Sequence, residues 1–184
     1  EIRCAWGANN NYCFTTTALT SKIWLIYEDD NGEWQGKAVA DIGDASKVPL
    51  PVDISITSDD QGLWVDTFMD GKARYFDISD PFNPVQKYEE TIGSQVNMIS
   101  QSWDGKRAYF STSLLGNWDK TGDADEQWVK LYEWDDESLE LSHKWTIDFY
   151  KEKLGRAHQM RFGAYSLYSS KSESNKKEVT LLDK

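Results

Sequence analysis

An internal repeat constrains the fold of this chain more than any other feature. Three β-rich runs begin at Tyr12, Leu63 and Ala108, which are 51 and 45 residues apart. Each run follows a turn rich in Asn, Asp and Gly, residues that tolerate the positive φ of tight hairpins. A repeat of this length is typical of chains in which one supersecondary unit recurs and stacks on its neighbours.

Each repeat carries the pattern of four short strands. The predicted first strands are 2–6, 52–57 and 96–102, the second 12–17, 63–68 and 108–113, the third 22–27, 72–77 and 128–133, and the fourth 36–42, 85–92 and 139–149. Asn31-Gly32, before the fourth strand of the first repeat, is typical of a two-residue hairpin. Four antiparallel strands per repeat predict an all-β fold, the β-propeller, in which first strands line a central channel and aromatic faces pack between blades.

The repeats also predict how the chain is divided. We expect blades at about 1–48, 49–93 and 94–154, the start of a further blade at 155–163, and a partly flexible C-terminal segment at 164–184. A propeller generally closes with four to eight blades, because closure protects the sheet edges. We therefore expect this chain to supply about three and a half blades, roughly half of a propeller that has seven blades in the full protein.

Composition excludes several classes of function. The chain has 31 acidic and 20 basic residues, a formal charge of −11, which argues against binding to nucleic acid or to an anionic membrane. Nine Trp, nine Tyr and seven Phe are typical of a folded chain rather than an acidic disordered one. No stretch approaches the twenty apolar residues of a membrane span, so none is expected.

Few residues could carry chemistry, and the sequence contains no nucleophile elbow, P-loop, dinucleotide fingerprint or HExxH helix. His158 lies in a predicted channel-lining strand, where an imidazole could bind a metal or move protons. A hydrogen-bonded structural histidine is the alternative at that position, and both interpretations stay open. His143 lies on a predicted outermost strand, where we expect it to be exposed and without a role.

The two cysteines and one acidic loop have alternative interpretations. Cys4 and Cys13 flank the first hairpin and lie opposite each other if Ala8-Asn9 forms its turn. Free buried thiols are the favoured interpretation, and a cross-strand disulfide is the alternative. The loop 119–126 contains oxygen ligands suited to calcium, but its spacing differs from an EF-hand, which favours a solvated loop.

Several segments together resemble one known family. They are Val52–Asp60, Arg74–Pro81, Ser102–Tyr109, Ser111–Lys120 and Arg156–Phe162, in that order. Across about residues 18–163 the chain is similar to the selenium-binding protein family, whose bacterial members are methanethiol oxidases. The resemblance places these residues in the C-terminal half of the family, in agreement with the blade count.

The resemblance implies a copper-dependent oxidase that converts methanethiol and dioxygen to formaldehyde, hydrogen sulfide and hydrogen peroxide. The family's proposed metal ligands are histidines, and His158 is the one that falls in a matching motif here. The implied partners are methanethiol, dioxygen and the remaining half of the propeller, and a homo-oligomer stays open. The implied location is the periplasm, with the cytoplasm as the alternative.

Two departures from the family pattern bear on function. Many members have a histidine where this chain has Asp70, so a ligand carried by that histidine would be absent. The tail from Ala164 to Lys184 lacks the Gly-, Cys- and Trp-containing end of eukaryotic members, which favours a bacterial-type branch. Because one fold hosts many functions, a non-catalytic binding or assembly module and a selenium or copper carrier remain alternatives.

Overall fold

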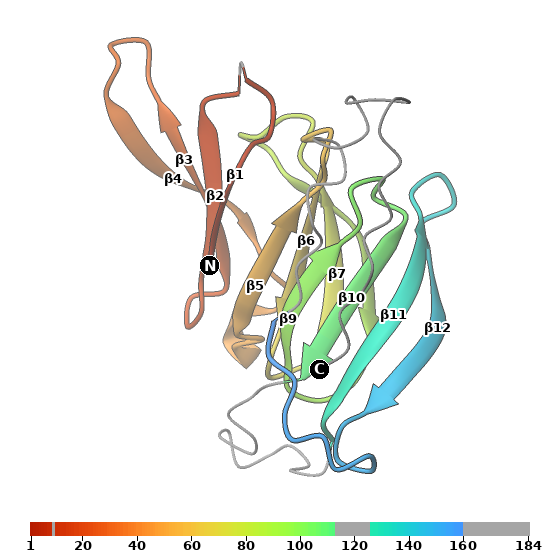
Figure 1. The fold of residues 1–184 in the computed structure, drawn as a ribbon. Helices are drawn as coiled ribbons and strands as arrows, with labels where there is room; N and C mark the ends of the chain where they lie inside the picture. The colour runs from red at the N-terminus through yellow and green to blue at the C-terminus, as the bar shows by residue number, and fades with distance from the viewer. Residues whose placement is uncertain (9, 113–125, 160–184) are drawn as a thin grey trace, which may run out of the picture.

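The computed structural model of the chain describes residues 1–8, 10–112 and 126–159, which form three antiparallel four-stranded sheets (Figure 1). The first sheet contains β1 (Ile2–Cys4), β2 (Tyr12–Thr17), β3 (Lys22–Glu28) and β4 (Trp34–Asp41). The second contains β5 (Pro51–Ile56), β6 (Gly62–Thr67), β7 (Lys72–Asp77) and β8 (Val85–Thr91). The third contains β9 (Val96–Gln101), β10 (Arg107–Thr112), β11 (Trp128–Asp135) and β12 (Glu140–Asp148). Strand order follows the chain in every sheet, so the prediction of four antiparallel strands per repeat is confirmed.

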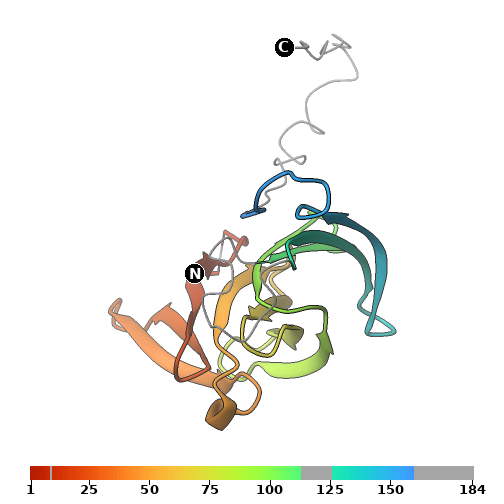
Figure 2. The same ribbon diagram turned by 90° about the horizontal axis from the view of Figure 1, so that it is seen from below.

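The sheets follow one another as the sectors of a fan (Figure 2). The first strands of consecutive sheets contact each other, β1 with β5 and β5 with β9, so these strands form the inner edge of the fan. The middle sheet is covered on both faces, and β6 is accordingly buried along its whole length. The outermost strands β4 and β8 are mostly exposed.

Two apolar cores lie between the sheets. The core between the first and second sheets includes Phe14, Leu25 and Val65. The core between the second and third sheets is built around Trp64, which is fully buried and meets the ring of Trp134 at 4.8 Å between centroids. The aromatic packing expected between blades is therefore present, because large rings fill the space between two facing sheets.

The structure corrects two local predictions. β1 ends at Cys4. The amide of Ala5 still donates to the carbonyl of Tyr12, but the amides of Trp6 and Gly7 donate to the carboxylate of Asp60 in the second sheet, so pairing with β2 does not continue to Trp6. The predicted Asn31-Gly32 turn is a longer turn from Asp29 to Glu33, because Asp29 accepts hydrogen bonds from the backbone amides of Asn31 and Glu33.

The opening of a further blade at 155–163 stays a prediction. Residues 157–159 form no strand, and residues 160–163 lie outside the described part of the chain. A strand requires a hydrogen-bonded neighbour. Here the carbonyl of His158 instead accepts a hydrogen bond from the Ser111 side chain.

Candidate functional site

A buried carboxylate joins the inner strands of all three sheets. Asp53, on β5, is fully buried and accepts a hydrogen bond from the guanidinium of Arg3 on β1 at 3.0 Å. It also accepts from the backbone amide of Ile99 on β9 at 3.1 Å and from that of Ile54 at 2.9 Å. One side chain therefore holds the channel side of three consecutive sheets together.

A second buried acid lies directly behind Asp53. Asp66, on β6, accepts a hydrogen bond from the backbone amide of Asp53 through Oδ1 at 2.8 Å. Its other oxygen, Oδ2, is buried and has no hydrogen-bond partner among the described residues. Burial raises the pKa of Asp66 well above its ordinary value, and the negative charge of Asp53 adds to the shift. The environment therefore favours the neutral acid at Asp66.

The pKa of Asp53 is raised less strongly, for the same reason. Burial raises its pKa, whereas the amide of Ile99 and the charge of Arg3 lower it. A strand that reads Trp64-Val65-Asp66 contains one acidic residue in an apolar run, and this is the signal from which the buried acid pair could have been found. The sequence analysis did not single out either residue.

His158 lies in an irregular segment beyond the third sheet, and its side chain is exposed. Its carbonyl oxygen accepts a hydrogen bond of 2.6 Å from the hydroxyl of Ser111, which is fully buried on β10. His143 lies on β12, exposed as predicted, with Nε2 2.9 Å from the hydroxyl of Thr146. The structure therefore does not place the two histidines in one site.

The copper site implied by the resemblance is not complete in the described part of the chain. No group of three or more His, Cys, Asp and Glu side chains that could hold a metal occurs among the described residues. The exposed imidazole of His158 fits one ligand of such a site. The other ligands would have to come from residues outside the described part.

The two cysteines form a disulfide, so the favoured prediction of free thiols is wrong. The register pairs Cys4 with Cys13 directly across β1 and β2, with 3.8 Å between their Cα atoms. A metal ligand role requires a thiolate, which the oxidised pair does not offer.

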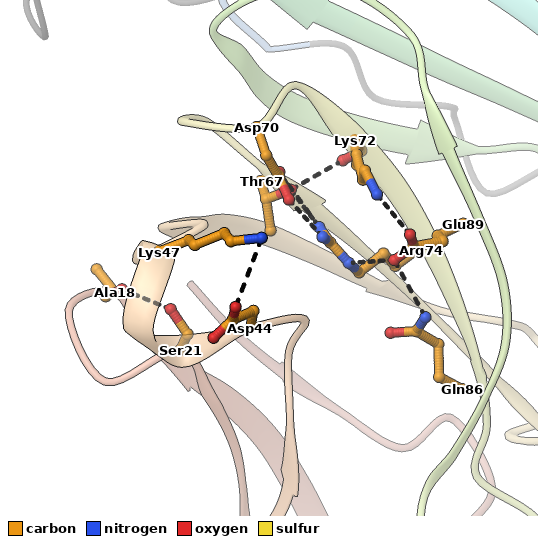
Figure 3. Close-up of polar contacts among 10 residues, drawn as sticks. All are labelled: Ala18, Ser21, Asp44, Lys47, Thr67, Asp70, Lys72, Arg74, Gln86 and Glu89. Atoms are coloured by element: carbon orange, nitrogen blue, oxygen red, sulfur yellow. Dashed lines mark hydrogen bonds and ion pairs between the residues drawn. The ribbon is translucent and has the colours of Figure 1, made fainter.

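Asp70, the position of the family's histidine, belongs to a charged network in the second sheet (Figure 3). Its carboxylate forms an ion pair with Arg74, whose side chain is 2% exposed, and accepts a hydrogen bond from the hydroxyl of Thr67. Arg74 also lies 3.3 Å from a carboxylate oxygen of Glu89, which pairs with Lys72. The carboxylate at Asp70 therefore neutralises a buried cation.

The remaining sequence candidates lie mostly outside the described residues. Of the acidic loop 119–126, only Glu126 is described, and its carboxylate accepts hydrogen bonds from the amide of Ser94 and the indole of Trp128. The rest of that loop and the segment 164–184 lie outside the described residues. Within the described residues no helix has the length and hydropathy to cross a bilayer.

Two surface hollows lie beside the third sheet. One, of about 510 Å³, is lined by Lys106, Arg107, Glu133, Trp134, Asp135, Glu140 and Ser142. The other, of about 180 Å³, is lined by Thr57, Ser58, Asp59, Tyr75, Asp104, Gly105, Lys106, Trp134 and Asp136. His158 and Asp53 line neither hollow, so both are separate from the inner-strand cluster.

Known proteins share this sequence over most of its length. The chain is 65% identical over 170 residues to a methanethiol oxidase of Ruegeria pomeroyi, covering 92% of this chain and 38% of the relative. It is 56% identical over 164 residues to a methanethiol oxidase of a Hyphomicrobium species, covering 89% of this chain and 37% of the relative. The chain therefore spans less than two fifths of the length of these relatives.

Solved structures show the same fold. A hypothetical selenium-binding protein from Sulfolobus tokodaii superposes with a TM-score of 0.68 at 26% identity, over 81% of this chain and 41% of that one. The β-propeller domain of Cps50 from Myceliophteria thermophila superposes with a TM-score of 0.58 at 10% identity, over 78% and 43%. The three sheets are thus part of a propeller.

The sequence profile of the 56kDa selenium binding protein family matches residues 1–169. This match covers all three sheets, the inner-strand acids and His158. The chain belongs to the 56kDa selenium binding protein family.

Proposed function

We propose that this chain is part of a copper-dependent oxidoreductase that oxidises methanethiol with dioxygen. One molecule each of methanethiol, dioxygen and water would give formaldehyde, hydrogen sulfide and hydrogen peroxide, so that the carbon loses two electrons and dioxygen gains two. The observation that carries the proposal is the identity of more than half of the aligned residues to two bacterial methanethiol oxidases. Because the chain spans only part of those relatives, the activity belongs to the whole protein.

The residues of this chain would supply one wall of the active site. His158 would provide one imidazole ligand, while Asp53 and Arg3 hold the inner strands in place. Copper, when bound, would favour the thiolate form of the substrate and accept electrons from it. The raised pKa of Asp66 disfavours a second buried charge beside Asp53.

The disulfide bears on the compartment. Disulfides persist in the bacterial periplasm and are rare in the reducing cytoplasm. The Cys4–Cys13 bond therefore supports the periplasm as the location, although the cytoplasm was the alternative from the sequence.

Metal analysis and turnover of the full-length protein test the proposal. Wild-type protein is expected to contain copper and to produce peroxide when methanethiol is supplied. His158→Ala should lose at least about tenfold in turnover, as expected for loss of a metal ligand, whereas the matched control His143→Ala should retain both copper and turnover. Wild-type protein with no copper and no turnover would defeat the oxidase proposal.

A carrier is the second candidate, because the family description itself names selenium binding. A carrier would bind selenium or copper and release it without forming peroxide. The same assay separates the two, since a carrier keeps the bound element and shows no methanethiol-dependent peroxide. A non-catalytic binding or assembly module would show neither property.

A further inference from the structure

One position recurs in the second strand of every sheet and carries a polar side chain. Thr15, Asp66 and Ser111 each follow a fully buried apolar residue, namely Phe14, Val65 and Phe110. Each side chain bonds to the backbone of the channel side of the fan. Thr15 donates to the carbonyl of Glu1 at 2.7 Å, and Asp66 accepts from the amide of Asp53 at 2.8 Å. The side chain at this recurring position therefore bonds the second strand to backbone on the channel side of the fan.

Ser111 differs from the other two in the segment that it holds. Thr15 bonds to Glu1, directly before the first strand of its repeat, and Asp66 bonds to the first strand of its own. Ser111 instead donates to His158, 47 residues further along the chain. The pairing of β10 with β9 shifts register between Ser111 and Thr112. The hydroxyl of Ser111 thus bonds to the segment that follows the third sheet.

The surroundings of the two residues joined by this hydrogen bond favour a positioning role for Ser111. Ser111 is fully buried on β10 and pairs with β9 and β11, whereas His158 is exposed and lies in a segment that forms no strand. A hydrogen bond from this buried, paired strand to the carbonyl of His158 restricts the backbone from which the imidazole extends. Sites built on loops depend on such supporting bonds for their geometry.

We infer that Ser111 is a positioning residue, whose hydroxyl fixes the backbone of His158 and so the direction of its imidazole. This inference rests on the proposed function, because it assigns Ser111 to the support of a copper ligand. The role is indirect, through the carbonyl of His158, and needs no contact between Ser111 and substrate.

Volume-matched variants of the full-length protein test the inference. Ser111→Thr keeps a hydroxyl, and Thr15 is the natural residue at the same position of the first repeat. Ser111→Val has nearly the volume of Ser111→Thr but no hydroxyl. Ser111→Ala removes the hydroxyl without adding volume, in case the larger side chains disturb the sheet. Thr15→Ala is the matched control, because it removes the equivalent bond of the first repeat, whose acceptor is Glu1 rather than His158.

Two readouts are measured on each variant: the EPR spectrum of the copper-loaded protein and the amide hydrogen exchange of residues 157–159. Ser111→Ala and Ser111→Val are expected to change the copper hyperfine pattern and to exchange about tenfold faster at 157–159, as expected for loss of one anchoring bond. Ser111→Thr and Thr15→Ala should match wild type in both. The kcat of the two hydroxyl-less variants should fall more than their KM rises.

The outcomes separate this inference from the proposed function. If wild-type protein binds no copper, the proposed function fails and the positioning role fails with it. If wild-type protein binds copper but Ser111→Ala and Ser111→Val give its EPR spectrum and exchange rates, the Ser111 assignment alone is overturned. If Ser111→Thr behaves like Ser111→Val, volume rather than the hydroxyl is responsible, which also overturns the assignment.

Discussion

At the scale of single residues, the inner edge of the fan depends on buried charge. Asp53 satisfies its carboxylate with three donors from three strands, so its burial is compensated by hydrogen bonds. Asp66 has one oxygen without a hydrogen-bond partner in the described part of the chain and is held close to that first carboxylate. Two adjacent buried carboxylates cannot both be charged at low cost, so one of them is favoured as the neutral acid.

This arrangement predicts how stability depends on pH. The pKa of Asp66 is higher in the folded protein than in the unfolded chain. Its contribution to the free energy of unfolding is therefore complete below the unfolded pKa and is lost as the pH rises through the folded pKa. Asp66→Asn keeps an oxygen for the amide of Asp53 and never ionises. At pH 8, urea unfolding should therefore give Asp66→Asn a free energy of unfolding at least about 1 kcal/mol above that of wild type. This difference should vanish toward about pH 4.

The control for this prediction is Asp29→Asn. The amides of Glu33 and Asn31 lower the pKa of that exposed carboxyl, so its contribution to the free energy of unfolding is lost as the pH falls. Asp29→Asn should therefore be less stable than wild type chiefly at neutral pH. A pH-independent difference between Asp66→Asn and wild type would contradict the assignment of a raised pKa to Asp66.

At the scale of elements, the first hairpin is held by contacts outside its own ladder. β1 has three residues, which is short for a strand that forms the edge of a sheet. The disulfide ties it to β2, and the carboxylate of Asp60 accepts hydrogen bonds from Trp6, Gly7 and Asn10 near the hairpin tip. The position of β1, and of Arg3 on it, therefore depends on both contacts.

Removal of the disulfide should destabilise the protein by a measurable amount. Cys4 and Cys13 are separated by nine positions, and closing a loop of about 10 residues is worth about 2.5 kcal/mol in the chain-entropy model. The double variant Cys4→Ser, Cys13→Ser should show that loss in urea unfolding. Reductant should lower the midpoint of wild type and leave that of the double variant unchanged; an equal response of both proteins would show that the bond is absent.

At the scale of the whole molecule, the sheets are stabilised by packing on one another. Each of the two apolar cores draws side chains from two consecutive sheets, so the middle sheet takes part in both. Trp64 of the second sheet meets Phe110 and Trp134 of the third, with ring centroids 5.9 and 4.8 Å away. Loss of this ring would weaken the interface between two blades.

Trp64→Ala is expected to cost about 3 to 5 kcal/mol, the usual loss for a fully buried large aromatic side chain. Trp34→Ala is the matched control, because Trp34 is 57% exposed on β4 and should change stability by no more than about 0.5 kcal/mol. Urea unfolding followed by far-UV circular dichroism measures the free energy of unfolding of both variants. Equal losses in the two variants would contradict the assignment of the core between the second and third sheets.

The strands and the repeat were predictable from sequence because they depend on local chemistry. Side chains alternate across a strand, and Gly, Asn and Asp mark the turns, so β2 and β7 begin and end at the predicted residues. The family was also predictable, since motifs such as Arg156–Phe162 are readable in linear order. His158 was found in this way, although its surroundings were not.

The tertiary structure alone decided which distant residues meet. Asp60 with Trp6, Asp53 with Ile99 and Ser111 with His158 are separated by 54, 46 and 47 positions, and no local pattern encodes such pairs. The first two pairs arise because consecutive sheets pack face to face. The third arises because the segment after the third sheet returns to β10. The sequence by itself thus determined the blades and the family, whereas the tertiary structure decided which carboxylates are buried and that the hydroxyl of Ser111 meets the carbonyl of His158.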